Sequence, residues 1–384
     1  MMIGLFWFAT TSARKTPLDI VHPSSDNFEG KIIWIKLERA LRREPAMTAI
    51  PCMFHFPQAA RRRRAALLVF LLTSYLVLPS PLVAWGSIGH MTVAYFAYQR
   101  LTPSTKGRVR DLLKLNPDYA SWDKQIPASA TPDDHDRMIF MIAATWADDI
   151  KGNSKYSDDG ADPNTPSGVT SAQNIGYTDL FRHRYWHFID LPLYVDGARG
   201  YVTPTPNAET QITAFRTVLS STQPDDLKSY DLVWLLHLIG DVHQPLHSVT
   251  RVSPTDTKGD AGGNAVTLKG DASSNLHAYW DDLPGADCNF CNNKAHCLDR
   301  AEVLGKTLQT PTSKASKRTD AATWISESFT YARTQVYKTP IASRGGPFTI
   351  VPSSTYELAA QKLANKRLAV AGSRLAAVLN GELK

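Results

Sequence analysis

The stretch DLKSYDLVWLLHLIGDVHQPLH, residues 226–247, combines a helical apolar pattern with potential metal ligands. Leucine, valine and tryptophan recur at helical spacing up to Asp241. His237 and Asp241 are four residues apart, so on a helix they share one face and both can reach one ion. Because Pro245 cannot continue the helix, the chain turns there and brings His247 back toward the same place. The stretch predicts a long helix that ends at a metal site.

Apolar residues recur at the same helical spacing in four further segments, which are Met91–Leu101, Arg137–Ile150, Asp320–Tyr337 and Tyr356–Leu379. The range Lys151–Asp179 is polar and rich in Gly, Asp, Ser and Asn, which predicts one long surface loop. Alternating patterns typical of strands are scarce, and Asn264–Lys269 is the best short strand. We therefore predict a mainly α fold: a single helical domain with a short β-hairpin and long surface loops.

A secretory signal peptide is predicted well inside the chain. Arg61–Arg64 supply a positive region, and Ala65–Leu78 are fourteen residues without a charge. A short segment ending in the small residue Ala84 follows, which completes the three-part signal pattern. The uncharged run is shorter than the roughly 20 apolar residues that span a bilayer. We expect cleavage after Ala84, so that the mature chain begins at Trp85.

This signal divides the chain into three parts. A signal peptide that starts at Met47 or Met53 occupies residues 47–84, and we interpret residues 1–46 as a mis-assigned extension of the gene start. Residues 85–384 then form one domain. We expect it to be secreted or periplasmic, monomeric, and without a membrane anchor after signal cleavage.

The charge of the chain excludes some classes of function. The whole chain has a net charge of +6, but residues 1–84 hold 11 Lys+Arg and 5 Asp+Glu, so residues 85–384 carry 31 of each sign. A strongly basic nucleic-acid-binding domain is therefore excluded, and any nucleic acid must be bound by local chemistry. Neither a P-loop nor a G-x-G-x-x-G motif is present, so nucleoside-triphosphate and dinucleotide chemistry have no support.

Most of the nine His residues after Ala84 lie beside Asp at metal-ligand spacings. A second pair four residues apart is His277 and Asp281, and further motifs are Trp146-Ala-Asp148-Asp149, Trp186-His187-Phe188-Ile-Asp190 and Trp85-Gly-Ser-Ile-Gly-His90. One His-x-x-x-Asp pair is more often a solvated pair or a core hydrogen bond, but two pairs together favour a metal centre. Imidazole and carboxylate ligands suit zinc, whereas magnesium or calcium would require more oxygen. His243 does not share the face of His237, and we interpret it either as a residue that supports the metal ligands or as structural.

In this order, the motifs resemble the trinuclear-zinc secreted nucleases of fungi, plants and bacteria, which share their fold with bacterial zinc phospholipase C. The resemblance extends through nearly all of Trp85 to Asp281, and after Asp281 only the helical pattern of the sequence matches. It implies three Zn²⁺ ions per chain. The implied ligands are Asp148, His187, His237 and Asp241 for one ion, His247, His277 and Asp281 for a second, and Trp85 through its free amino group and carbonyl, His90 and the shared Asp241 for a third.

The resemblance also implies an activity. It is the hydrolysis of single-stranded DNA and RNA to 5′-phosphorylated products, together with 3′-nucleotidase activity. A zinc-bound water that loses its proton near neutral pH would attack the phosphate as hydroxide. Asp148 would orient this water. Lys151 stands where the family typically has an Arg that helps hold the phosphate. Lysine keeps the positive charge but cannot form the two parallel hydrogen bonds of a guanidinium group.

Substrate contacts follow from the same resemblance. Phe188 would stack on the base and Asp190 would bond to its edge, although core packing beside a ligand explains both residues nearly as well. The run Gly262-Gly263-Asn264 either brings backbone close to the substrate or forms only a turn. Single-stranded nucleic acid and 3′-nucleotides are therefore the expected substrates, since a duplex hides its bases.

Two other functions stay open. A zinc phospholipase C would also begin with Trp and use His-x-x-x-Asp, but its last ligand is typically Glu rather than Asp281, and its first His lies further from the terminus than His90. A non-catalytic exported zinc binder would tend to show a dense His-rich tract, which is missing.

The three cysteines after Ala84 also allow two interpretations. A further metal site would use Cys288, Cys291, His296 and Cys297, but a disulfide is the plainer interpretation in an exported protein. Few cysteines and no Asn-x-Ser/Thr sequon are present, which suggests a bacterial enzyme.

Overall fold

The computed structural model describes residues 85–160, 169–271, 273–286, 294–341 and 346–383. All of them belong to one compact unit, Pro79–Lys384. The expected signal peptide and extension, residues 1–84, lie outside the described residues, as do Cys288 and Cys291. Cys297 is disulfide-bonded, which agrees with the plainer of the two interpretations of the cysteines.

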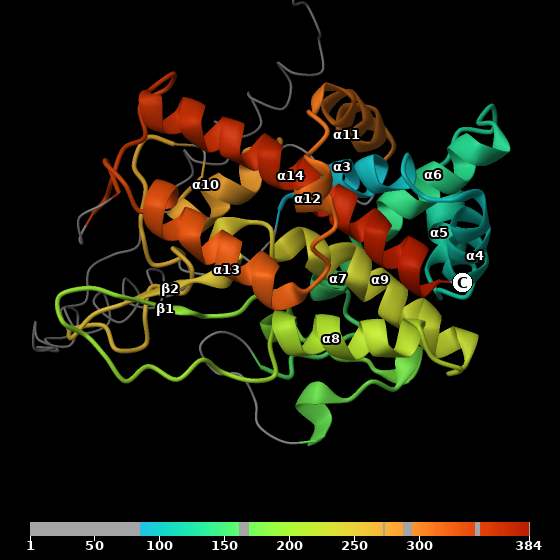
Figure 1. The fold of residues 1–384 in the computed structure, drawn as a ribbon, viewed down its shortest axis with the longest axis horizontal. Coiled ribbons are helices and arrows are strands. Elements are labelled where there is room, and N and C mark those ends of the chain that lie inside the picture. The colour runs from blue at the N-terminus through green and yellow to red at the C-terminus, as the bar shows by residue number, and fades with distance from the viewer. Residues whose placement is uncertain (1–84, 161–168, 272, 287–293, 342–345, 384) are drawn as a thin grey trace, which may run out of the picture. The chain divides into compact units, whose positions relative to one another are not determined.

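Helices dominate the described residues, which confirms the predicted mainly α class (Figure 1). The α-helices are α3 (Ser87–Tyr98), α4 (Pro103–Leu113), α5 (Tyr119–Asp123), α6 (Pro132–Ala143), α7 (Trp146–Asp149), α8 (Ala208–Leu219), α9 (Asp225–Asp241), α10 (Leu276–Asp282), α11 (Ala295–Thr307), α12 (Ser313–Ser316), α13 (Ala321–Tyr331) and α14 (Thr355–Glu382). Shorter turns are the 3₁₀ segments η1 (Ile150–Gly152), η2 (Val169–Ala172), η3 (Gly176–Thr178), η4 (Arg184–His187) and η5 (Pro245–Ser248) and the π-helical η6 (Ala332–Val336). No helix among these is long and apolar enough to cross a membrane.

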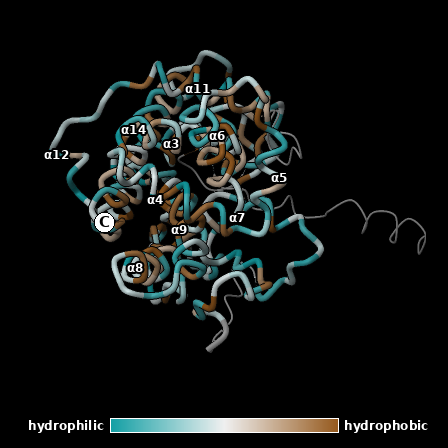
Figure 2. The backbone as a smooth tube through the Cα atoms, turned by 90° about the vertical axis from the view of Figure 1, so that its right-hand side faces the viewer, coloured by the Kyte–Doolittle hydropathy of each residue, from teal (hydrophilic) through white to brown (hydrophobic). Residues whose placement is uncertain are grey.

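Helix α9 is the core helix around which the others pack. Its last thirteen residues, Ser229–Asp241, are all buried, and Figure 2 shows hydrophobic residues along it. It contacts α3, α4, α7, α8 and α14. Asp225 and Asp226 lie in its first turn, where acidic side chains interact favourably with the helix dipole. Because this part of α9 is buried on all sides, its C-terminal end carries His237 and Asp241 into the interior.

The helix predicted for Arg137–Ile150 is divided in the structure. Helix α6 ends at Ala143 and α7 begins at Trp146. The break leaves the Ala144 carbonyl at a helix end, where carbonyl groups lack an intrahelical partner. It accepts a hydrogen bond from His237 Nδ1 at 2.8 Å. The break therefore anchors a side chain of α9.

The predicted β-hairpin is wrong. Strand β1 (Pro192–Tyr194) pairs in parallel with β2 (Thr250–Val252). A parallel pair cannot be joined by a tight turn, and here the crossover contains α8 and α9. The strand predicted at Asn264–Lys269 is also absent, because this segment forms only isolated bridges at Thr267 and Leu268.

The polar range Lys151–Asp179 contains 3₁₀ turns and an isolated bridge at Ser157 in its described parts, in agreement with the predicted loop. The buried ring of His183 ties it down, since Nδ1 lies 2.6 Å from Asp159 Oδ2 and Nε2 lies 2.8 Å from Asp179 Oδ2. Burial lowers the pKa of this imidazole, but the two carboxylates outweigh it and raise the pKa. His183 also stacks on Trp186, so the loop is fixed beside η4.

Two buried arginines of α14 hold the turn that follows α9. Arg367 Nε donates to the His243 carbonyl at 3.0 Å, and Arg374 Nη1 lies 3.0 Å from His243 Nε2. Both guanidinium groups also bind the Glu327 carboxylate of α13, at 3.0 and 2.8 Å. His243 Nδ1 donates to the Ile239 carbonyl. Of the two roles considered for His243, these contacts agree with the structural one.

Replacing Glu327 by Gln should destabilise the protein in a pH-dependent way. Burial raises the pKa of Glu327, but Arg374 and Arg367 outweigh it and lower the pKa to about 2. The ionised carboxylate therefore stabilises the fold above its unfolded pKa of about 4.5, and this contribution is lost as the pH falls toward 2. At pH 7 the substitution should lower the free energy of unfolding by about 3 kcal/mol, because two buried guanidinium groups lose their partner. Urea unfolding from pH 7 to pH 2 measures this, and a difference that does not depend on pH would contradict it.

Candidate metal centre and active-site pocket

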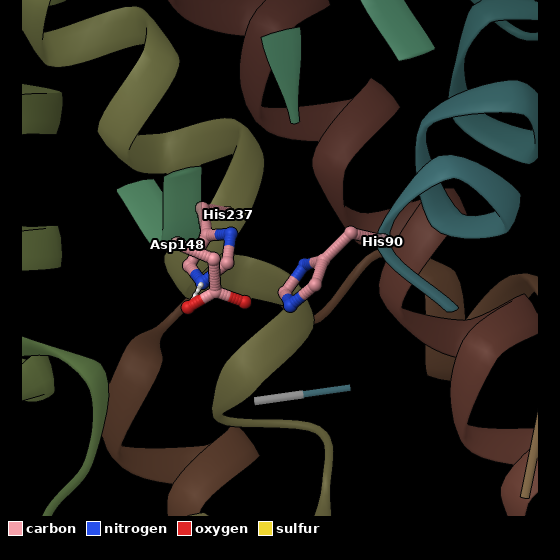
Figure 3. A group of neighbouring side chains, drawn as sticks. All are labelled: His90, Asp148 and His237. Carbon is pink, nitrogen blue, oxygen red and sulfur yellow. Dashed lines mark ion pairs between the residues drawn. The ribbon is translucent and has the colours of Figure 1, made fainter. Parts of the chain in front are cut away.

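Side chains from six elements converge at the end of α9. All nine residues predicted to ligate metal are buried, namely Trp85, His90, Asp148, His187, His237, Asp241, His247, His277 and Asp281. The ligand atoms of eight of them, all except Trp85, form three groups, each within 4.8 Å, which are His90, Asp148 and His237; His187, His237 and Asp241; and His247, His277 and Asp281. In Figure 3 the rings of His90 and His237 and the carboxylate of Asp148 point toward one another.

Asp241 lies at the centre of the first two groups. Its Oδ1 lies 3.2 Å from His90 Nε2, while its Oδ2 lies 3.0 Å from His187 Nδ1 and 3.3 Å from His237 Nε2. Asp148 Oδ1 approaches from the other side, 3.5 Å from His237 Nε2 and 3.9 Å from His187 Nδ1. The two carboxylates and three imidazoles therefore surround one small volume.

The third group has two imidazole nitrogens that face each other. His247 Nδ1 donates to the His187 carbonyl at 2.9 Å, and His277 Nδ1 donates to the Gly262 carbonyl at 2.8 Å. A neutral imidazole carries one proton, so both Nε2 atoms bear lone pairs, and they lie 3.1 Å apart. Asp281 adds a carboxylate, with Oδ2 at 3.4 Å from His277 Nε2. A cation is the partner that satisfies all of these acceptors.

The chemistry of the donor set fits a bound metal. Buried polar atoms without a hydrogen-bond partner gather here, and they include both ring nitrogens of His90, Asp241 Oδ1 and Asp281 Oδ2. Such atoms are rare in folded proteins and indicate an ion or water that satisfies them. Imidazole nitrogen and carboxylate oxygen are ligands that zinc prefers, and the hydrogen bonds from the opposite ring nitrogens orient the rings.

Burial sets the charge of these groups. It lowers the pKa of His277 to about 4 and lowers the pKa of three further imidazoles, those of His90, His187 and His247. It also raises the pKa of Asp241 to about 8. Burial would raise the pKa of Asp148 too, but Lys151 Nζ, 2.6 Å away, and His237 hold it well below its usual range. These four imidazoles are therefore neutral, which is the form that binds metal. At His237 burial is outweighed by the carboxylates of Asp241 and Asp148, which raise the pKa of its imidazole.

The residue expected to begin the mature chain lies beside this centre. The indole of Trp85 is buried and donates to the Gly240 carbonyl at 3.1 Å. The next residue, Gly86, donates its backbone N–H to the Asp281 carbonyl at 3.0 Å. The backbone of Trp85 is thereby held between the end of α9 and α10.

The loops that carry the ligands are joined by backbone and side-chain hydrogen bonds. Ile189 N donates to the His247 carbonyl at 2.9 Å, in line with the β1–β2 pairing. Gln244 Nε2 donates to Asp281 Oδ1 at 2.7 Å, and its Oε1 accepts from Leu246 N. Gln244 was not among the predicted site residues, although its place in the His-Gln-Pro-Leu-His run was a usable signal.

A pocket opens onto the metal-ligand groups. It is lined by Lys151, Arg184, His187, Phe188, Asp190, Leu246, His247, Ala261, Gly262, Asn264 and His277. The residues predicted for catalysis and substrate contact, Lys151, Phe188, Asp190 and Asn264, are thus brought together, whereas Gly263 is not among the lining residues. Arg184 was missed, because nothing in the sequence marks it.

Gly262, rather than Gly263, is the glycine that the pocket requires. Its φ of +58° lies in the left-handed region, and a Cβ there would collide with the Leu246 carbonyl oxygen. Its own carbonyl holds His277. The sequence left open whether this double glycine approaches the substrate or forms only a turn, and in the structure Gly262 lines the pocket, packs closely against η5 and orients a ring.

The comparison with known proteins identifies the family. The sequence profile of the S1/P1 nucleases matches residues 85–384, which include the helices and the pocket described above. The chain belongs to the S1/P1 nuclease family. This confirms the resemblance drawn from the motifs, and it makes the chain a nuclease rather than a non-catalytic zinc binder.

Relatives within the S1/P1 nuclease family are plant and fungal enzymes. Endonuclease 2 of Arabidopsis thaliana is 24% identical over 333 residues, which cover 84% of this chain and 98% of that protein. Nuclease S1 of Aspergillus oryzae is 26% identical over 314 residues, with 77% and 91% covered. Nuclease P1 of Penicillium citrinum is 25% identical over 251 residues, with 63% and 72% covered. The bacterial type suggested by the sequence stays a prediction.

A methyl group at Gly240 should disturb the metal centre. A Cβ at this position would lie 2.9 Å from His90 Nδ1, so Gly240→Ala should displace the His90 ring. We expect zinc affinity to fall about tenfold, as for other changes that misorient a ligand, measured by competition with a chromogenic chelator. Gly107→Ala in α4 is the control, because a Cβ there meets only the end of the Arg110 side chain. Equal affinity in the two variants would contradict the predicted crowding.

Proposed function

We propose that this S1/P1 nuclease is a secreted enzyme that holds three Zn²⁺ ions and hydrolyses single-stranded DNA and RNA to 5′-phosphorylated products, with 3′-nucleotidase activity. The observation that carries the proposal is the set of three buried His/Asp groups, two of which reach one pocket through His187, His247 and His277. The signal pattern before Trp85 supports export, and we expect the mature enzyme to act as a monomer.

The ligand assignment is the one that the family resemblance implies, and only its second ion matches one of the three groups residue for residue. One ion would use Asp148, His187, His237 and Asp241, a second would use His247, His277 and Asp281, and a third would use His90, Asp241 and the amino group and carbonyl of Trp85. The contacts of Asp241 with three imidazoles support its role as the shared carboxylate. When bound, zinc lowers the pKa of water toward neutrality and stabilises the charge that develops on a phosphate.

Asp148 and Lys151 would act on the water and the phosphate. The Asp148 carboxylate stays ionised because Lys151 and His237 outweigh its burial, so it can accept a hydrogen bond from the attacking water and orient it. Lys151 also lines the pocket, where its ammonium group would bind a phosphate oxygen by a charge-assisted hydrogen bond.

Phe188 supports selectivity for single strands. Its ring is half-buried and lines the pocket next to Asp190. A base can stack on such a ring and bond to the carboxylate only after it leaves a duplex. The phospholipase alternative lacks a comparable observation in its favour.

A panel of substrates tests the proposed function directly. Processed protein should cleave single-stranded DNA, RNA and a 3′-nucleotide, and it should lose all three activities when zinc is chelated. Duplex DNA should be cut much more slowly. Release of phosphocholine from phosphatidylcholine without cleavage of any nucleic acid would overturn the proposal in favour of the phospholipase.

Asp241 should be the most sensitive carboxylate. Asp241→Asn keeps the shape but removes the charge shared by two ions, so both zinc content and turnover should collapse. Asp231→Asn is the matched control on the same helix. Asp231 is also buried, burial raises its pKa to about 8, and it bonds to Asn174, so it should tolerate an amide. Metal analysis and single-strand cleavage of both variants measure this. Near-normal activity of Asp241→Asn would refute the shared-ligand assignment.

The free terminus gives an independent test. An α-amino group has a pKa of about 8, so it can bind zinc near neutral pH, whereas an amide nitrogen within a chain cannot. Protein with one extra residue before Trp85 should therefore lose about one zinc per chain and most of its activity. N-terminal sequencing of active protein should begin Trp-Gly-Ser-Ile-Gly-His. Full activity of the extended protein would show that Trp85 is not a ligand.

A further inference from the structure

The pocket contains an arginine that neither the motifs nor the proposed metal chemistry uses. Arg184 begins η4, three residues before His187, and lines the pocket together with Lys151 and Phe188. We propose that Arg184 binds the phosphate on the 5′ side of the nucleoside held at Phe188, so that the enzyme prefers a polynucleotide chain to a 3′-mononucleotide. This inference rests on the proposed nuclease and 3′-nucleotidase activities.

The guanidinium of Arg184 is oriented by the carboxylate of Asp158, which also binds Arg182. Its Nε donates to Asp158 Oδ1 at 2.9 Å, while Arg182 Nη1 donates to Asp158 Oδ2 at 2.9 Å. The hydrogen bonds from the two arginines lower the pKa of Asp158, so the carboxylate is ionised. Two guanidinium groups on one carboxylate leave a net charge of about +1. No other hydrogen bond joins the Arg184 guanidinium to the residues that the structure describes, so its terminal N–H groups can bind a ligand.

The other charges around the pocket do not replace Arg184. Lys151 forms a close ion pair with Asp148, at 2.6 Å, and Asp190 carries the wrong sign for an anion. Arg182 shares Asp158 but is not among the residues that line the pocket. Arg184 therefore supplies positive charge where a second phosphate would reach the pocket rim, and its planar fork matches two phosphate oxygens.

The chemistry of the substrate decides which phosphate Arg184 would bind. Cleavage that leaves a 5′ phosphate on the product breaks the bond to the 3′ oxygen, so the nucleoside in the pocket carries the scissile phosphate on its 3′ side. A 3′-nucleotide has no other phosphate. Within a polynucleotide the same nucleoside also carries a phosphate on its 5′ oxygen. Arg184 would therefore distinguish the two substrates by this second phosphate.

Two small substrates isolate this contact: a nucleoside 3′-phosphate and the same nucleoside with phosphates on both its 3′ and 5′ oxygens. For Arg184→Gln we expect KM for the bisphosphate to rise about tenfold, because the loss of one charge-assisted hydrogen bond weakens binding by about that factor. The ratio of kcat/KM for the bisphosphate to that for the monophosphate should fall by the same factor. Short single-stranded DNA should follow the bisphosphate. Arg184→Lys should recover part of the ratio, because it keeps the charge without the fork.

Arg182→Gln is the matched control, because it removes the other partner of Asp158 from outside the pocket. It should leave the ratio of the two kcat/KM values at the wild-type level. Three results would each overturn the inference: an unchanged ratio in Arg184→Gln, an equal loss on both substrates, or the same fall of the ratio in Arg182→Gln. Wild-type protein that cleaves neither substrate would instead overturn the proposed function on which the inference rests.

Discussion

A buried carboxylate surrounded by three buried imidazoles is the constraint on which the rest of the structure depends. Asp241 has no exposed surface, and its oxygens lie 3.0–3.3 Å from ring nitrogens of His90, His187 and His237. Burial raises the pKa of the carboxyl and lowers the pKa of two of these rings, those of His90 and His187. Such a group of acceptors is costly in a protein interior unless cations satisfy it. The folded arrangement is therefore built to hold metal.

The fold can tolerate this polar centre because the surrounding elements hold it from several sides. Helix α9 is buried on all faces along its last thirteen residues and delivers Asp241 to the core. Arg367 and Arg374 from α14 fix the turn after α9 through His243. The parallel β1–β2 pair aligns the segments that carry His187 and His247. Elements far apart in the sequence thus position the ligands, which explains why the domain extends well beyond the last motif, to α14.

Short-range sequence patterns predicted the two His/Asp pairs of the candidate site and the turn toward His247, whereas the roles of the other site residues came from the family resemblance. The i,i+4 pairs His237/Asp241 and His277/Asp281 lie on helices as expected, and the chain turns at Pro245 into η5. Spacing is sufficient in these cases because a helix fixes which residues share a face.

Contacts between distant segments could not be predicted in the same way. The strand pairing is parallel instead of a hairpin, because the partner of β1 lies beyond two helices. The carbonyl of Gly262, and not that of Gly263, accepts the hydrogen bond from the His277 ring. Arg184 lines the pocket only because η4 lies beside it. Nothing in the local sequence around these residues records which distant group they meet.

Anomalous diffraction at the zinc absorption edge, from crystals of the processed protein, tests the central claim most directly. The account predicts three zinc peaks: one among Asp148, His187, His237 and Asp241, one among His247, His277 and Asp281, and one bounded by Trp85, His90 and Asp241. A single peak, no peak, or peaks away from these residues would contradict the three-zinc centre proposed here.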